Sequence, residues 1–210
     1  SGNEILTEYD ANGNISSVTD RDGNKTAYKY DNLNRIISET TSDGTISYTY
    51  DGRGNKTSVT DRRGDTVNYT YDGNNLITQL ETAKGITKFA YDNEGRLTSQ
   101  TAPDDTILSN VYDAAGHVVK SVNGEGEISE YTYDAVGNVK TITAVNGDEK
   151  CIQTNEYYPN GKLKKTTFAD GTTQSYEYDK SWRITKITDG LGNSTITEYD
   201  LNGNVIRVTD

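Results

Sequence analysis

The chain has 210 residues, a formal net charge of −11, and no apolar run that approaches the length of a bilayer span. The negative charge argues against nucleic acid, whose phosphates need Lys and Arg, and against an anionic membrane surface. Leu, Ile, Val and Phe make up only 38 of the 210 residues, but 16 tyrosines add large semi-apolar side chains. We therefore expect a folded protein with no nucleic-acid partner and no membrane insertion.

One short unit recurs along the whole chain. Its anchor is a tyrosine, which aspartate follows in nine of ten units, and successive anchors lie 20, 21 or 24 residues apart. Such a period is typical of repeat proteins, so residues 1–210 are predicted to form a single array without an internal domain boundary. The anchors are Tyr9, Tyr30, Tyr50, Tyr71, Tyr91, Tyr112, Tyr133, Tyr157, Tyr178 and Tyr199.

Each unit carries two turn signals, one directly after the anchor and one fourteen residues after it. Glycine and asparagine tolerate positive φ, so Asp-x-x-Gly is predicted to form a turn whose aspartate accepts hydrogen bonds from that turn. The first-turn positions are Asp10 and Gly13, Asp31 and Asn34, Asp51 and Gly54, Asp72 and Asn75, Asp92 and Gly95, Asp113 and Gly116, Asp134 and Gly137, Gly161, Asp179, and Asp200 and Gly203. The second-turn positions are Gly23, Gly44, Gly64, Gly85, Asp105, Gly126, Gly147, Gly171 and Gly192.

The segments between these turns are rich in Thr, Val, Ile and Tyr, which favours strands of about five to seven residues. Each unit is therefore predicted to be a β-hairpin, and the protein to be all-β, with tandem antiparallel hairpin repeats in a curved or spiralling continuous sheet. Alternation places aromatic residues such as Tyr48 and Tyr50 on one face. Apolar residues also recur six and nine residues after the anchor. These two sites fall on opposite faces unless a bulge intervenes, and the sequence leaves both arrangements open.

Three departures from the pattern lie in the second half of the chain. The seventh unit has three extra residues, which predicts a longer or bulged hairpin around residues 144–160. Tyr158-Pro159 replaces the usual Asp-x, and Trp182 takes a position that favours positive φ. Because a bulky side chain resists that conformation, we expect a turn of another type there, with Trp182 at a bend near the surface. Trp182 and Tyr158 are the candidate contacts for a glycan or a partner protein.

The chain begins and ends at the same phase of the repeat, which predicts that it is a piece of a longer array. A sheet segment of this kind has two open edges, and open edges are templates for strand pairing. We therefore expect self-association through the sheet edges.

The segments YDAVGNV (Tyr133–Val139) and YDLNGNV (Tyr199–Val205) resemble the YD repeat of the Rhs family, and the resemblance extends over essentially the whole chain. That family includes bacterial Rhs polymorphic toxins, wall-associated proteins, the C subunits of toxin complexes, and teneurins. The resemblance implies a β-sheet that winds into a hollow shell, which in bacterial members encloses a variable C-terminal toxin. It also implies a secreted or cell-surface location.

The chain departs from the bacterial members in one respect. Their core ends in a DPxG-like motif with aspartyl autoproteolysis, and neither Ala102-Pro103-Asp104 nor the segment from Tyr158 to Gly161 matches that motif. The resemblance therefore implies a segment of the shell wall that encloses or presents a C-terminal toxin domain. The alternative is an adhesin-like module that binds a glycan or partner protein through its aromatic surface.

No catalytic constellation is visible in the sequence. His117 is the single histidine and lies beside a turn, and Cys151 is the single cysteine. The repeated aspartates could suggest calcium, but the glycine-rich Gly-Gly-x-Gly-x-Asp pattern of calcium-binding β-repeats is absent. The tyrosine rows could stack on sugars or pack against one another across strands. We predict a non-enzymatic protein with no catalytic residues, no metal site and no cofactor.

Overall fold

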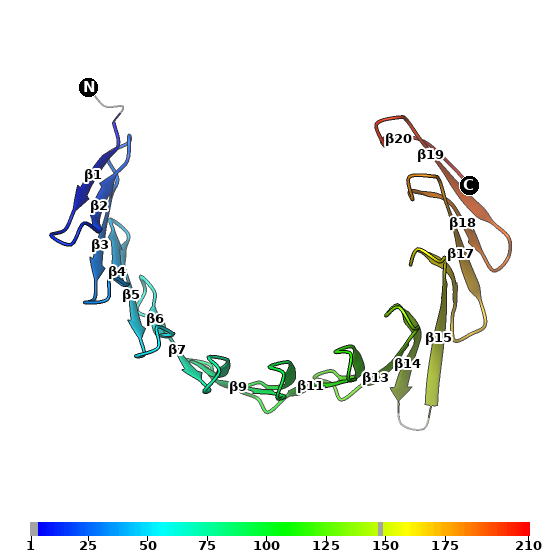
Figure 1. Cartoon of the computed structure of the whole chain (residues 1–210), viewed down its shortest axis with the longest axis horizontal. Helices are drawn as coiled ribbons and strands as arrows, with labels where there is room; N and C mark the ends of the chain where they lie inside the picture. The colour runs from blue at the N-terminus through cyan, green and yellow to red at the C-terminus, as the bar shows by residue number, and fades with distance from the viewer. Residues whose placement is uncertain (1–3, 147–148) are drawn as a thin grey trace. The chain divides into compact units, whose positions relative to one another are not determined.

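A computed structural model describes residues 4–146 and 149–210, and every regular element in these ranges is a β-strand (Figure 1). The chain divides into two compact units, Ser1–Thr106 and Ile107–Asp210. The first unit contains β1 (Leu6–Tyr9), β2 (Ile15–Thr19), β3 (Lys25–Tyr30), β4 (Ile36–Thr41), β5 (Gly44–Tyr50), β6 (Lys56–Thr60), β7 (Thr66–Tyr71), β8 (Ile77–Thr82), β9 (Gly85–Tyr91) and β10 (Leu97–Thr101). The second contains β11 (Ile107–Tyr112), β12 (Val118–Val122), β13 (Ile128–Tyr133), β14 (Val139–Asn146), β15 (Glu149–Tyr157), β16 (Leu163–Thr167), β17 (Thr173–Tyr178), β18 (Ile184–Asp189), β19 (Ser194–Tyr199) and β20 (Val205–Thr209).

Within each unit, every strand pairs antiparallel with the next strand in the sequence, as in β5–β6, β6–β7 and β7–β8. The prediction of tandem antiparallel hairpins is therefore confirmed. The chain enters and leaves each hairpin at neighbouring positions, so only short connections are needed.

A β-bulge after each anchor decides which side chains share a face. In the β5–β6 pair, Tyr50 lies opposite Lys56 and Thr49 lies opposite Ser58, so Thr57 is the extra residue. Tyr48 then lies opposite Val59. Directly opposed side chains point to the same face, so the apolar sites six and nine residues after the anchor both join the tyrosines. The sequence left this point open, and the bulge resolves it.

The two faces of each sheet differ in chemistry. We call the face that carries the anchors the tyrosine face and the opposite one the threonine face. On the threonine face, hydroxyl pairs bridge neighbouring strands, such as Thr49 and Ser58 at 2.6 Å and Thr60 and Thr66 at 2.8 Å. Strand β7 alternates accordingly, with Val67, Tyr69 and Tyr71 half-buried and the residues between them exposed.

None of the described hydrophobic side chains is fully buried, because no second layer covers either face within a unit. The only described residues whose exposure is as low as 3% are polar, Ser17 and Thr166. The tyrosine rings thus bury their surface mainly against neighbouring repeats. Sheet hydrogen bonds and contacts between adjacent repeats therefore hold the fold together, as in other quasi-linear arrays.

The length of the second turn explains why successive anchors lie 20 residues apart in some repeats and 21 in others. In six of the described second turns the connection has five residues with glycine or Asp105 at the fourth place. In the first of them, Gly23 donates to the Asp20 carbonyl and Asp20 donates to that of Asn24. In the units anchored by Tyr30 and Tyr71 a two-residue connection replaces it, with Thr41 opposite Gly44 and Thr82 opposite Gly85. These are the two units of 20 residues. The extra residues of the seventh unit lengthen β14 and β15 to 8 and 9 residues, and Gly147 lies outside the described residues.

Every described residue four or fourteen residues after an anchor has positive φ, whether it is glycine, asparagine, Asp105 or Trp182. This includes Trp182, whose φ is 60°. Trp182 donates its amide to the Asp179 carbonyl and Asp179 donates to that of Arg183, the same pattern as in the other units. The expectation of a different turn type at Trp182 was therefore wrong. The backbone hydrogen bonds and the Asp179 side chain hold this turn in the common form despite the bulky residue.

Candidate functional site

Within each compact unit the first turns connect the paired strands of the hairpins, and an aspartate organises all of them except the turn of Tyr158. In the third of these turns, Asp51 Oδ1 accepts from the amides of Arg53 at 2.9 Å and Asn55 at 2.8 Å. Its Oδ2 accepts from the Asn55 side chain at 2.9 Å. These bonds favour the charged carboxylate, and the side-chain bond from Asn55 is the main cause that lowers the pKa of Asp51. Each such aspartate serves its own turn.

The anchor tyrosines connect neighbouring repeats through their hydroxyl groups. The Tyr50 hydroxyl donates to the Ile36 carbonyl at 2.8 Å, and the Tyr71 hydroxyl donates to the Lys56 carbonyl at 2.8 Å. The β4–β5 ladder ends at the pair Ser38 and Ser47, so the Ile36 carbonyl lies beyond it. The hydroxyl thus serves a carbonyl that the β4–β5 ladder does not reach. Tyr30, Tyr91, Tyr133, Tyr157, Tyr178 and Tyr199 make the same bond to the preceding repeat.

The residue five positions after the anchor lies against the next repeat. The Arg35 guanidinium sits 4.6 Å from the centre of the Tyr50 ring and donates to the Asp51 carbonyl. His117 stacks on Tyr133 with ring centres 4.5 Å apart. A side chain with a flat polar group is suited to this place, because it covers the ring and reaches the next turn. Sequence reasoning missed this role, although Arg, Asn or His in eight of ten units was a visible signal.

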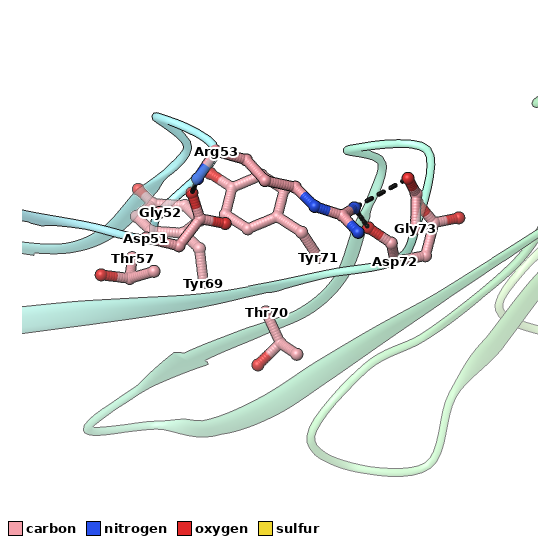
Figure 2. A pocket seen from close by; sticks show the side chains of 9 residues that line it. All are labelled: Asp51, Gly52, Arg53, Thr57, Tyr69, Thr70, Tyr71, Asp72 and Gly73. Atoms are coloured by element: carbon pink, nitrogen blue, oxygen red, sulfur yellow. Dashed lines mark hydrogen bonds between the residues drawn. The ribbon is translucent and has the colours of Figure 1, made fainter.

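Open clefts lie between successive first turns. Figure 2 shows one of them, lined by Asp51, Arg53, Tyr69 and Tyr71 among others. The Arg53 side chain extends toward the next turn and its Nη1 donates to the Gly73 carbonyl at 2.8 Å. The cleft is thus occupied by a contact between repeats, and its lining does not assemble a nucleophile with a base.

The two residues predicted as contact candidates lie together. The ring centres of Tyr158 and Trp182 are 6.4 Å apart, and the Tyr178 ring lies 5.9 Å from the first and 6.2 Å from the second. The Tyr158 hydroxyl donates to the Tyr176 carbonyl at 3.1 Å, so this side chain leans onto the next repeat. We call Tyr158, Tyr178 and Trp182 the aromatic cluster.

The remaining reactive residues are dispersed. His117 Nδ1 lies 3.0 Å from Asp113 Oδ2, within its own turn, and the exposed Cys151 lies on β15. Among residues 4–146 and 149–210, no three His, Cys, Asp or Glu side chains are grouped so that they could hold a metal ion. The same residues contain no helix that is long and apolar enough to cross a membrane.

Two family models match this chain. A model described as RHS Repeat matches residues 9–46, 50–87 and 71–107, and a model described as Teneurin YD-shell matches residues 104–210. The chain belongs to the Rhs/YD-repeat family. Its ten Tyr-Asp units are the YD repeats of that family, and the resemblance drawn from the sequence is confirmed. No curated protein sequence matches the chain.

Solved structures of toxin complexes share the fold of these YD repeats. The crystal structure of TcdB2-TccC3 without its hypervariable C-terminal region is 17% identical, with a TM-score of 0.74 over 97% of this chain and 12% of that chain. TcdB2-TccC3 itself gives 17% identity and a TM-score of 0.73 over the same shares. The Photorhabdus luminescens Tc holotoxin pore is 15% identical, with a TM-score of 0.55 over 98% of this chain and 14% of that one. The YD repeats here therefore span about an eighth of those chains.

Proposed function

We propose that this chain is a non-catalytic structural scaffold, a segment of the β-shell of a secreted or cell-surface YD-repeat protein. The ten repeats, residues 1–210, form one array in this proposal. The observation that carries it is the recurring bond from the anchor tyrosine hydroxyl to the preceding repeat. These contacts use the polar groups of the turns and anchors for cohesion, which suits a wall. Membership in the YD-repeat family supports the same role.

The shell of the parent protein encloses or presents a C-terminal toxin domain. In this proposal the partners of the chain are the remaining repeats and that cargo domain, with neither nucleic acid nor membrane insertion involved. Support comes from the fold shared with the TcdB2-TccC3 complex, whose solved forms include one without a hypervariable C-terminal region. The turn aspartates and glycines set the geometry of the wall.

The test uses the full-length parent protein with the domain downstream of the array. Limited proteolysis is followed by mass spectrometry of the C-terminal domain, with a variant that opens the wall by Tyr50→Phe, Tyr71→Phe and Tyr91→Phe as the comparison. Protection of the C-terminal domain in the parent, lost in the variant, is the expected result. A C-terminal domain that is cleaved equally fast in both proteins, together with electron micrographs without an enclosed volume, would refute the enclosing role.

The isolated chain also presents strand surface for association with a second copy. All five residues of β20 are exposed, and Val205, Ile206 and Val208 retain 56%, 62% and 59% of their accessible surface. Exposed β-branched strands are templates for edge pairing. We therefore propose self-association of the 210-residue chain through its sheet edges, which light scattering tests against the monomer mass of 23.1 kDa.

A further inference from the structure

Two departures from the repeat converge on one place. Tyr158 stands where nine units have aspartate, and Trp182 stands where the other nine have glycine or asparagine. They belong to neighbouring repeats, and their side chains meet with Tyr178 in the aromatic cluster. Two independent changes that produce one contact indicate that this spot has a role of its own beyond the shared construction of the array.

Trp182 is held there at a conformational cost. Its φ of 60° is rare for a bulky residue, and glycine or asparagine adopts that conformation with less strain. Burial does not offset the cost, because Trp182 retains 46% of its accessible surface. An exposed aromatic side chain in a strained turn is typical of a functional position. The Asp179 carboxylate supports it by accepting from the amides of Ser181 and Arg183.

The segment of sequence that carries the cluster has a net charge of opposite sign to that of the chain as a whole. Residues 157–183 contain five Lys and Arg against three Asp and Glu, while the chain carries a net charge of −11. Lys162 follows the turn of Tyr158, Lys180 lies in the turn of Trp182, and both are exposed. A half-exposed indole whose turn carries the exposed Lys180, close to a tyrosine whose turn is followed by the exposed Lys162, suits a ligand with an apolar ring face and a negative charge.

We propose that the aromatic cluster, with Lys162 and Lys180, is a binding site for an acidic sugar, a pyranose that carries a carboxylate. The indole of Trp182 and the ring of Tyr158 contact the apolar face of the pyranose. The two lysines attract its carboxylate. The site lies on single turns of the wall and does not depend on the scaffold proposal.

Trp182 is the only tryptophan in the chain, so its intrinsic fluorescence reports binding directly. The complete 210-residue chain is titrated with trigalacturonic acid and with its trimethyl ester, which keeps the pyranose rings and removes the charge. We expect saturable quenching by the acid with a Kd of about 1 mM or tighter, and at least tenfold weaker binding of the ester. Added salt weakens binding of the acid.

Three variants locate the site. Binding to Trp182→Gly is measured by calorimetry, because this variant has no tryptophan fluorescence. Tyr158→Asp and Trp182→Gly, which restore the residues of the other repeats, each weaken binding at least tenfold, roughly the loss of one aromatic contact. Lys162→Asn weakens it several-fold. The control variant Lys84→Gln changes an exposed lysine in a turn of the first compact unit, and its binding affinity should equal that of the unchanged chain.

Stability separates a binding site from a packing device. If the cluster serves binding, Trp182→Gly removes backbone strain and leaves the urea midpoint unchanged or raised. A midpoint lowered as by a core truncation would make the cluster a packing device and overturn the proposal. Absence of quenching by millimolar trigalacturonic acid overturns it as well, and so does equal binding of the ester, which would remove the role of the lysines.

Discussion

Removal of a single anchor hydroxyl tests whether the tyrosines connect the repeats. Tyr71→Phe deletes the donor that lies 2.8 Å from the Lys56 carbonyl and keeps the ring. A hydrogen bond of this kind contributes about 1 kcal/mol net, and the carbonyl left behind is partly buried. With a urea m-value of about 2 kcal/mol/M, we expect the midpoint to fall by about 0.5 M.

The matched control lies two residues earlier on the same strand and the same face. Tyr69 is half-buried like Tyr71, and its hydroxyl makes no hydrogen bond within the described residues. Tyr69→Phe should therefore shift the midpoint by less than about 0.2 M, since only a solvated hydroxyl is lost. Comparison of the two variants separates the hydrogen bond from any general effect of the ring substitution.

The assay combines urea denaturation with native-state hydrogen exchange, because long arrays can lose cooperativity and then have no single midpoint. In Tyr71→Phe, protection should decrease first at the β6–β7 pair, and less at β1–β2, where Tyr9 is the anchor. Equal midpoints for Tyr71→Phe and Tyr69→Phe, with uniform exchange along the chain, would refute the connecting role of the anchor hydroxyl.

Four further predictions follow from the turns, the charges and the edges. Gly54→Ala should lower the unfolding free energy by about 1 kcal/mol from its φ of 94° alone, because the space around the new Cβ is open. Gly85→Ala should lower it more, because its Cβ would lie 2.8 Å from Pro103 Cβ, and denaturation of both variants measures the difference. Asp51→Ala removes the acceptor for the amides of Arg53 and Asn55, so it should lower the thermal midpoint, whereas a matched change at the exposed Asp43 should not. The folded state lowers the pKa of many turn aspartates, chiefly through side-chain hydrogen bonds such as those from Asn14 to Asp10 and from Asn204 to Asp200. The stabilisation by these aspartates is therefore present above their unfolded pKa and is lost as the pH falls through the lower folded values. Thermal midpoints should drop below about pH 4, and constant midpoints down to pH 2 would contradict this. Light scattering at high concentration should show species above 23.1 kDa, and Val208→Lys on the exposed strand β20 should reduce them, whereas a monomer at all concentrations would rule out edge pairing.

Local patterns were sufficient for the repeat architecture. The spacing of tyrosine, aspartate and glycine predicted the hairpins, because strand alternation and positive φ are properties of a few consecutive residues. The bonds from Asp51 to its own turn are of the same local kind. The family followed from the same residues, since ten units agree in phase.

The positions that the sequence did not resolve depend on neighbouring repeats. The bulge at Thr57, which brings Lys56 and Val59 to the tyrosine face, is fixed only when two strands pair. The expected turn change at Trp182 was wrong because residue preference was considered without the hydrogen bonds that hold the turn.

The sequence by itself determined the period, the strands and the turns of this protein. Only the tertiary structure decided which side chains of each repeat contact the next repeat. The Tyr71 hydroxyl binds the carbonyl of Lys56, 15 positions earlier in the sequence. The ring of Tyr158 lies against that of Trp182, 24 positions later. Such contacts depend on strand register and on the bulge, so they have no local signal, and only the paired sheet places these groups within reach of one another.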